Sequence, residues 1–228
     1  MCGRFTSQRG TREMAELFGA APTGESLSPS FNVAPGQLVQ AVVVRDGART
    51  LLPMRWGLIP SWAKEAAIGN RLINARAETV AEKPAFRRAF RERRCLIPTD
   101  GFYEWKSEGG PKRPWHIRLA DREVFAFAGL WERWLPPEGE PVLSCAIITV
   151  EANAFMQAIH TRMPAILPHE DEAAWLDPAQ RDPAALLRLL RPYPSDAMRG
   201  REVSTFVNRP ANNSPQCLLP LEGEESKR

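Results

Sequence analysis

The residue with the most distinctive chemistry is Cys2, which directly follows the first methionine in Met1-Cys2-Gly3-Arg4-Phe5. If Met1 is removed, Cys2 carries a thiol with an ordinary pKa of about 8.5 and an α-amino group with one of about 7.7–8.0. Both groups are partly deprotonated near neutral pH, so both can attack an electrophile. This 1,2-aminothiol suits an aldehyde, because the amine forms a Schiff base and the thiolate then closes a thiazolidine ring. From the pentapeptide alone, the alternative is that Cys2 stands at the second position by chance and has no function there.

Among the three histidines, His160 is the candidate for proton transfer. It stands between a predicted short helix and a predicted strand, where catalytic groups tend to sit, and it can move protons near neutral pH. His116 alternates with apolar neighbours and is predicted to be exposed, while His169 has no obvious partner. A structural or exposed role for His160 remains the alternative.

A single carboxylate, Glu104, stands among three aromatic residues in the segment GFYEW at positions 101–105. Burial there would raise its pKa and make it a general acid or base, whereas a simple strand would point it to water. Asn74 and Arg76 lie two apart in a non-helical stretch, hence on one face. The Asn74 amide could bind a sugar or leaving group, and the Arg76 guanidinium could bind a phosphate. The alternative is a structural asparagine beside a surface arginine.

Seven tryptophans is a high count for 228 residues. Trp56, Trp62 and Trp105 fall in segments rich in glycine and proline, where a large exposed ring needs a reason. Stacking on unpaired bases is one such reason, usually with arginines that follow the backbone of the strand.

The bulk composition is that of an ordinary globular protein, with 43% hydrophobic residues and a net charge of +3. Four cysteines without a CxxC pair argue against zinc, so we expect no metal and no cofactor, and a reduced, cytoplasmic protein. We expect neither a signal peptide nor a membrane span. The cysteines are Cys2, Cys95, Cys145 and Cys217.

The elements that must position these residues are mostly short strands. The clearest is a hairpin, with strands at Leu38–Arg45 and Thr50–Trp56 around the turn Asp46-Gly47. Further strands are predicted at Cys95–Pro98, Trp115–Leu119, Val124–Trp131, Leu143–Val150, Ala165–Leu167 and Glu202–Val207, the second and third of these as a pair. Strands outnumber helices, which predicts one α+β domain with an antiparallel, barrel-like core and peripheral helices. It spans residues 1–221, and the charged tail 222–228 is predicted to be disordered.

Two of the predicted helices depend on their first residues. Thr11 is predicted to cap a helix over Thr11–Phe18, and Pro84 to open one over Pro84–Arg94. Arg87, Arg91 and Arg94 would then share a face, either solvated or facing phosphates. The other predicted helices are Asn153–Ile159, Asp171–Leu176 and Asp182–Leu190.

Six segments, in this order, resemble those of the SOS-response-associated peptidase (SRAP) family of abasic-site processing proteins. Each motif is weak alone, but six in register are specific, and the match runs to about residue 215. The segments are MCGRF at 1–5, NVAPG at 32–36, RWGLIP at 55–60, NARAET at 74–79, GFYEW at 101–105 and HTRMP at 160–164.

The resemblance implies a protein that crosslinks itself to abasic sites in single-stranded DNA, including at junctions with duplex DNA, and shields them at replication forks. Cys2 would be the nucleophile after Met1 is lost, with Asn74 positioning the sugar, Glu104 handling protons at the amine and Schiff base, and His160 as general acid. The implied DNA contacts are Arg4, Arg76, Arg162, Trp56, Trp62, Trp105, Asn32 and Pro35. Some lyase activity and self-removal of Met1 are also implied, and a monomer is assumed.

Two other classes of function stay open. A Cys2 thiol with a histidine and a glutamate could hydrolyse peptides in trans. Alternatively, the aromatic residues could read modified bases without covalent chemistry. Cys2→Ser separates these, because it removes the thiazolidine but keeps an amine able to form a Schiff base.

Overall fold

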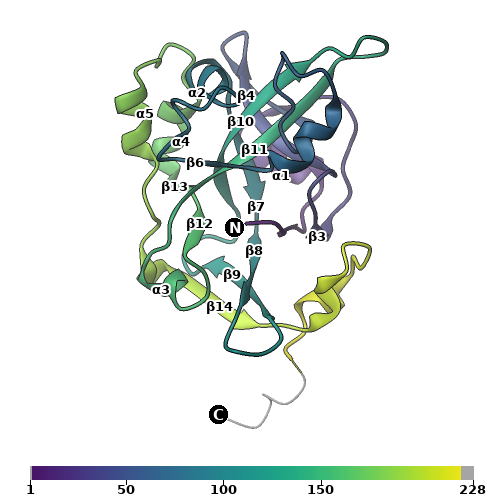
Figure 1. The fold of residues 1–228 in the computed structure, drawn as a ribbon, viewed down its shortest axis with the longest axis vertical. Coiled ribbons are helices and arrows are strands. Elements are labelled where there is room, and N and C mark those ends of the chain that lie inside the picture. The colour runs from purple at the N-terminus through teal and green to yellow at the C-terminus, as the bar shows by residue number, and fades with distance from the viewer. Residues whose placement is uncertain (1, 222–228) are drawn as a thin grey trace.

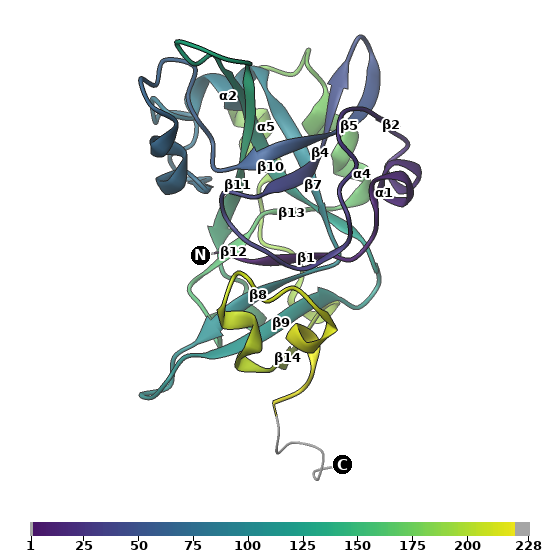
Figure 2. The same cartoon turned by 90° about the vertical axis from the view of Figure 1, so that its right-hand side faces the viewer.

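Two β-sheets form the framework of the computed structural model, which describes residues 2–221 (Figure 1). The larger sheet contains β2 (Ala21–Pro22), β4 (Leu38–Arg45), β5 (Ala48–Trp56), β6 (Asn74–Arg76), β7 (Arg94–Thr99), β10 (Phe125–Trp134), β11 (Val142–Glu151), β12 (Arg162–Pro164) and β13 (Ile166–Leu167). The smaller sheet has the order β14 (Met198–Glu202), β9 (Arg113–Leu119), β8 (Gly101–Lys106), β1 (Phe5–Ser7), β3 (Ser30–Val33). Both figures place the smaller sheet below the larger one (Figures 1 and 2).

Five strands of the larger sheet close into a barrel in the order β11, β10, β7, β4, β5 and back to β11. The first four pairings are antiparallel, and the ring is closed by a parallel pairing in which Cys145 lies opposite Trp56. The expected single α+β domain with a barrel-like core is therefore confirmed, but the barrel is not purely antiparallel. Closure leaves these five strands without the open edges that invite aggregation.

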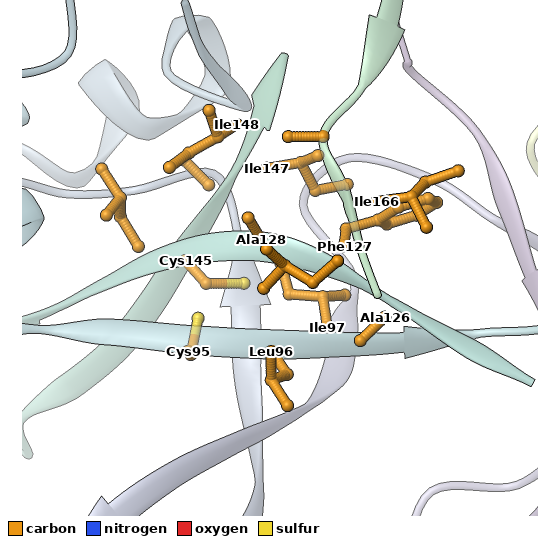
Figure 3. Close-up of a cluster of buried hydrophobic side chains, with 14 of the residues drawn as sticks. Cys95, Leu96, Ile97, Ala126, Phe127, Ala128, Cys145, Ile147, Ile148 and Ile166 are labelled. Carbon is orange, nitrogen blue, oxygen red and sulfur yellow. The ribbon is translucent and has the colours of Figure 1, made fainter. Parts of the chain in front are cut away.

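The barrel interior is filled with apolar side chains from neighbouring strands (Figure 3). Ile97 of β7, Phe127 of β10, and Cys145 and Ile147 of β11 are all fully buried. Strands covered on both faces lose the alternation of polar and apolar residues. This explains why Leu143–Val150 reads as a continuous apolar run rather than an alternating one.

The predicted hairpin is confirmed. β4 and β5 pair in register from Leu38 opposite Arg55 to Arg45 opposite Ala48. Asp46 and Gly47 have φ values of 49° and 78°, the left-handed pair that a type I′ turn requires and that matches the twist of the strands.

The prediction that 115–119 and 124–131 pair with each other is wrong. β9 pairs with β8 and β14 in the smaller sheet, whereas β10 pairs with β7, β11 and β13 in the larger one. The short segment between them therefore carries the chain from one sheet to the other. The last predicted strand is also misplaced, since β14 ends at Glu202 and a short 3-10 helix follows, capped by Ser204.

The α-helices are α1 (Thr11–Leu17), α2 (Arg87–Glu92), α3 (Ala154–Gln157), α4 (His169–Leu176) and α5 (Pro183–Leu189). Short 3-10 helices are Ala66–Arg71, Ser195–Ala197, Thr205–Asn208 and Pro215–Leu218. Asp182 caps α5 as expected, but α1 is preceded by Gly10, and the Thr11 hydroxyl instead accepts from the Leu27 backbone N–H. α2 begins three residues after Pro84, so Arg94 falls in β7 and is buried rather than on a helix face.

None of the helices within residues 2–221 is long and apolar enough to cross a membrane. The tail predicted to be disordered, 222–228, lies outside the described residues. At the other end, the chain enters between the two sheets, near β12 and β8 (Figures 1 and 2). The first described residue is thus brought to the junction where side chains from both sheets can meet it.

Candidate active site at the start of the chain

Cys2 lies fully buried just before β1, at this junction. The Asn74 side-chain amide donates a hydrogen bond to the Cys2 backbone carbonyl, with 2.8 Å between Nδ2 and O. Asn74 is the first residue of β6, which pairs in parallel with β11 of the barrel. The barrel therefore holds the amide that fixes the backbone of Cys2.

Glu104 belongs to β8 and is only 3% exposed. The sequence left two alternatives for Glu104: a buried carboxylate, or a residue on a strand that points to water. In the structure Glu104 lies on a strand, but on the face of the smaller sheet that is turned inward, so it is buried. Burial is the main reason that the pKa of the Cys2 thiol lies above its usual range, and the negative charge of Glu104 raises it further. Burial therefore favours the protonated thiol, and the Glu104 carboxylate is near enough to raise its pKa further.

His160 follows α3 and is half-buried. Its Nδ1 atom accepts a hydrogen bond from the Arg162 backbone N–H at 3.0 Å, because a backbone N–H can only donate. The same Nδ1 atom lies 3.2 Å from the Arg162 carbonyl oxygen, to which a ring protonated at Nδ1 would donate instead. The prediction that His160 is the proton-transfer histidine is compatible with both arrangements.

Arg76 and Arg162 lie beside these residues. Arg76 is exposed and stands two positions after Asn74 on β6, as the spacing predicts. The Arg162 guanidinium donates to both carboxylate oxygens of Glu78, at 2.7 and 3.0 Å, and to the Thr149 carbonyl. Sequence reasoning missed Glu78 as the partner that orients Arg162, although it stands in the same six-residue motif as Asn74 and Arg76.

Two residues expected to contact DNA, Arg4 and Asn32, are buried and hydrogen-bonded within the protein. Arg4 Nη1 donates to Asn32 Oδ1 at 2.7 Å and to the Val207 carbonyl at 2.8 Å. The Asn32 amide donates to the carbonyls of Val207, Arg209 and Asn212. Burial lowers the pKa of Arg4. Together they fasten the C-terminal segment to the smaller sheet, a long-range contact that local patterns cannot reveal.

The three tryptophans expected to stack on bases differ in exposure. Trp56 is fully buried at the end of β5, and its indole N–H donates to the Ile73 carbonyl, so the expectation of an exposed ring is wrong. Trp62 is 60% exposed. Trp105 is half-buried, with its indole N–H on Asn208 Oδ1 and the Arg4 guanidinium 5.7 Å from its ring centroid. Pro35 is exposed.

The other two histidines stand apart from Cys2. His116, expected to be exposed, is buried because its ring packs against Gly101 and the Tyr103 ring, and its Nε2 lies 3.3 Å from the Thr6 hydroxyl. His169 is exposed and, contrary to expectation, has a partner, the buried carboxylate of Glu172 at 3.4 Å. Within residues 2–221, no group of three or more His, Cys, Asp or Glu side chains is arranged to hold a metal ion.

Comparisons with known proteins bear on the whole chain. A family model described as SOS response associated peptidase (SRAP) matches residues 1–210. The abasic site processing protein YoqW of Bacillus subtilis (strain 168) is 48% identical over 223 residues, covering 96% of this chain and 99% of that protein. The abasic site processing protein HMCES of Gallus gallus is 34% identical over 226 residues, covering 85% of this chain and 67% of that protein. A crystal structure of a Bacteroides thetaiotaomicron protein superposes with a TM-score of 0.90 at 28% identity, covering 96% of this chain and 100% of that one.

Proposed function

The chain belongs to the SOS response associated peptidase (SRAP) family, and from this premise we propose that it processes abasic sites in DNA by forming a covalent crosslink through Cys2. Relatives named abasic site processing proteins support the DNA substrate. The observation that carries the proposal is the meeting of three side chains from distant segments. Cys2 is buried, Asn74 holds its carbonyl at 2.8 Å, and the charge of buried Glu104 acts on its thiol.

The reaction begins once Met1 has been removed. The Cys2 α-amine attacks the C1′ aldehyde of the ring-opened abasic sugar to give a carbinolamine, which loses water to form an iminium ion. The thiol then adds to the iminium carbon and gives up its proton, closing the thiazolidine. Overall, aldehyde and aminothiol give thiazolidine and one molecule of water.

Glu104 is the base for the second step. A thiol whose pKa is raised by burial is not a thiolate at neutral pH, so it needs a neighbour to take its proton as sulfur bonds to carbon. Glu104 is the carboxylate whose charge reaches that thiol. A low-dielectric site also strengthens the attraction between this carboxylate and the developing iminium charge.

His160 supplies a proton to oxygen. In the tautomer whose Nδ1 accepts from the Arg162 backbone N–H, the ring presents a proton at Nε2. We assign to His160 the protonation of the sugar ring oxygen as the ring opens. The proton released by the C1′ hydroxyl as the aldehyde forms returns to the imidazole, which then protonates the departing water. An iminium at C1′ also acidifies the C2′ proton, so slow β-elimination, a lyase activity, is expected.

The DNA strand is held by charge and by stacking. Exposed Arg76 and the oriented guanidinium of Arg162 are the proposed phosphate contacts. Trp62, with most of its ring in solvent, is the proposed stacking surface, and Trp105 and Pro35 border the strand. Unpaired bases are what such rings can reach, so single-stranded DNA, alone or beside a duplex, is the proposed partner of a monomeric protein.

The test is intact mass of the protein before and after incubation with a single-stranded oligonucleotide that carries one abasic site. We expect loss of Met1 and a heat-stable adduct of the mass of protein plus DNA minus water. Cys2→Ala should form no stable adduct, while Cys2→Ser should form only one that borohydride must trap. Cys217→Ala, which changes another buried cysteine, should crosslink normally.

Two results would overturn the proposal. Retention of Met1 in a protein that still crosslinks would exclude the aminothiol, and full crosslinking by Cys2→Ala would exclude Cys2 altogether. An oligonucleotide of the same sequence with no abasic site must give no adduct in either case.

A further inference from the structure

One large groove in the described part of the chain does not belong to the Cys2 site. It has a volume of about 1100 Å³ and lies over the outer face of the smaller sheet, between β9 and β14 on one side and α1 on the other. Figure 2 shows α1 on the side of the molecule away from the start of the chain. No residue proposed to act in the crosslinking reaction lines it.

Three exposed arginines project from adjacent strands into this groove. Arg118 of β9 lies directly opposite Arg199 of β14, and Arg201 lies opposite His116, one step along the same face. Like charges that face each other across a sheet destabilise it. A fold selected for stability alone would not place three of them in one ladder.

These three arginines also lack the ion pairs that the rest of the groove has. Arg9 is paired with Glu13 and Glu123, and Arg122 with Glu172. By contrast, within residues 2–221 Arg118, Arg199 and Arg201 form no ion pair. Arg199 and Arg201 only donate to backbone carbonyls, such as that of Leu218 for Arg201.

None of the acidic side chains of the lining forms an ion pair with this ladder. Glu13 and Glu123 pair with Arg9, Asp100 accepts from the backbone and side chain of Gln8, and Asp121 lies beside the Tyr193 hydroxyl. The lining carries five arginines against four carboxylates, and positive charge is concentrated on β9 and β14, where three of the five stand. Burial first, and then the charges of Arg201 and Arg118, lower the pKa of His116 beside them.

The chemistry of the ligand follows from the lining. Planar guanidinium groups match phosphate oxygens, and a row of them suits a chain of phosphates rather than one. No tryptophan, tyrosine or phenylalanine lines the groove, so it offers bases no surface on which to stack. We propose that Arg118, Arg199 and Arg201 form a second nucleic-acid site, which binds the phosphodiester backbone without reading sequence and holds DNA outside the crosslinking site.

The inference rests on the proposed function only in taking DNA as the partner, and its test uses DNA without an abasic site. Affinity for a duplex and for a single strand of equal length is measured by anisotropy over a range of salt, for wild type and for Arg118→Gln/Arg199→Gln/Arg201→Gln. The triple variant should bind at least tenfold more weakly at low salt. Its slope of log affinity against log salt should fall by about 2–3 for the duplex. The form of DNA that shows the larger loss is the one held by the groove.

Three controls make the result decisive. Arg12→Gln/Arg181→Gln/Arg188→Gln removes the same charge from exposed positions outside the groove and should leave the slope unchanged. The triple Arg→Lys variant at the groove positions should retain most of the slope. Thermal unfolding should show the Gln variant at least as stable as wild type, because repulsion has been removed.

The proposal fails if the groove variant and the charge-matched control lose affinity equally, since that would be a general charge effect. It also fails if neither changes. Both proteins are measured again with Cys2→Ala, which should not alter the groove's contribution. If the protein does not crosslink, the DNA-binding test can still be interpreted. If the groove does not bind DNA, the Cys2 proposal is unaffected.

Discussion

Two buried polar regions of this protein are built in opposite ways. At one end of the barrel, the Arg94 guanidinium is 5% exposed and donates to the carbonyls of Phe90, Arg91, Trp175, Asp177 and Gln180 at 2.5–3.0 Å. The first four of these carbonyls lie at the C-terminal ends of α2 and α4, where no intrahelical donor remains, and Gln180 follows α4. Arg94 therefore satisfies two helix ends at once, and its own donors are saturated.

At the Cys2 site, by contrast, one buried polar atom has no hydrogen-bond partner within residues 2–221. Asn74 uses its amide hydrogens on the Cys2 carbonyl, but its buried Oδ1 has no hydrogen-bond partner among residues 2–221. A buried acceptor without a partner costs about 1–3 kcal/mol, which folding alone gives no reason to keep. The two sites therefore differ in one respect: Arg94 is saturated by the chain itself, whereas Asn74 keeps an unused acceptor that a substrate can take.

The largest expected effect that tests this contrast is that of Glu104→Gln. The isosteric amide cannot accept the thiol proton, so crosslinking should slow by about 10²–10⁴, the usual range for a general acid or base. Because packing is kept, the free energy of unfolding should change by less than about 1 kcal/mol. Gel-resolved crosslinking rates and urea unfolding measure the two quantities.

Glu202→Gln is the matched control for Glu104. It is a second buried carboxylate on the same face of the smaller sheet, separated from Glu104 by Trp115 and paired with Arg113 at 3.0 Å. Its loss should affect stability but leave the crosslinking rate within about threefold of wild type. Equal slowing by both variants would mean that any buried negative charge in this sheet sustains the reaction, and Glu104 would lose its role as base.

Arg94→Met should lower stability and leave the crosslinking rate unchanged, the reverse of Glu104→Gln. It removes hydrogen bonds from a charged donor to two helix ends, so we expect a loss of about 3 kcal/mol in the free energy of unfolding. The crosslinking rate should be normal wherever the variant is folded. Arg91→Met, an exposed neighbour, should stay within about 0.5 kcal/mol of wild type. A normal stability for Arg94→Met would refute the idea that saturation marks a structural role.

Asn74→Ala should have a smaller effect on both quantities. It removes one hydrogen bond to the Cys2 carbonyl, worth about 1 kcal/mol, and about tenfold in rate if the backbone of Cys2 becomes less well placed. Asn74→Asp keeps an oxygen but loses the donor and adds a negative charge beside Glu104, so it should react more slowly than Asn74→Ala. If Asn74→Ala crosslinks at the wild-type rate, the 2.8 Å hydrogen bond has no part in the reaction.

The sequence predicted the local features and missed those that depend on distant contacts. The hairpin at Asp46-Gly47 and the cap at Asp182 are decided by two or three neighbouring residues, and both are confirmed. The parallel closure of the barrel and the separation of β9 from β10 depend on how sheets pack, which no local pattern records. The strand-rich pattern predicted the α+β class, and family resemblance supplied what that pattern could not, the relation to abasic-site processing proteins.

The candidate site shows the same division. The identities of Cys2, Asn74, Glu104 and His160 were predicted from the sequence, and their roles remain to be tested. Exposure was the weak point: Trp56 and Arg4 were expected at the surface, yet both are buried because segments distant in sequence cover them. Glu104 is buried on a strand because its sheet face packs inward, which an isolated five-residue motif cannot indicate.

A further effect concerns pH and His116, which lines the second groove. Burial, and then the charges of Arg201 and Arg118, lower the pKa of His116 from 6.5 to about 3. Below pH 6.5 the unfolded chain therefore takes up a proton that the folded protein refuses, so stability is lost as pH falls, at no more than about 1.4 kcal/mol per pH unit. Between pH 7 and 5, wild type should lose about 2 kcal/mol more than His116→Gln in urea unfolding. Arg201→Gln should reduce that difference, because it removes one of the charges that depress the pKa. Parallel stability curves for wild type and His116→Gln would show that His116 is protonated in the folded protein and that these charges do not depress its pKa.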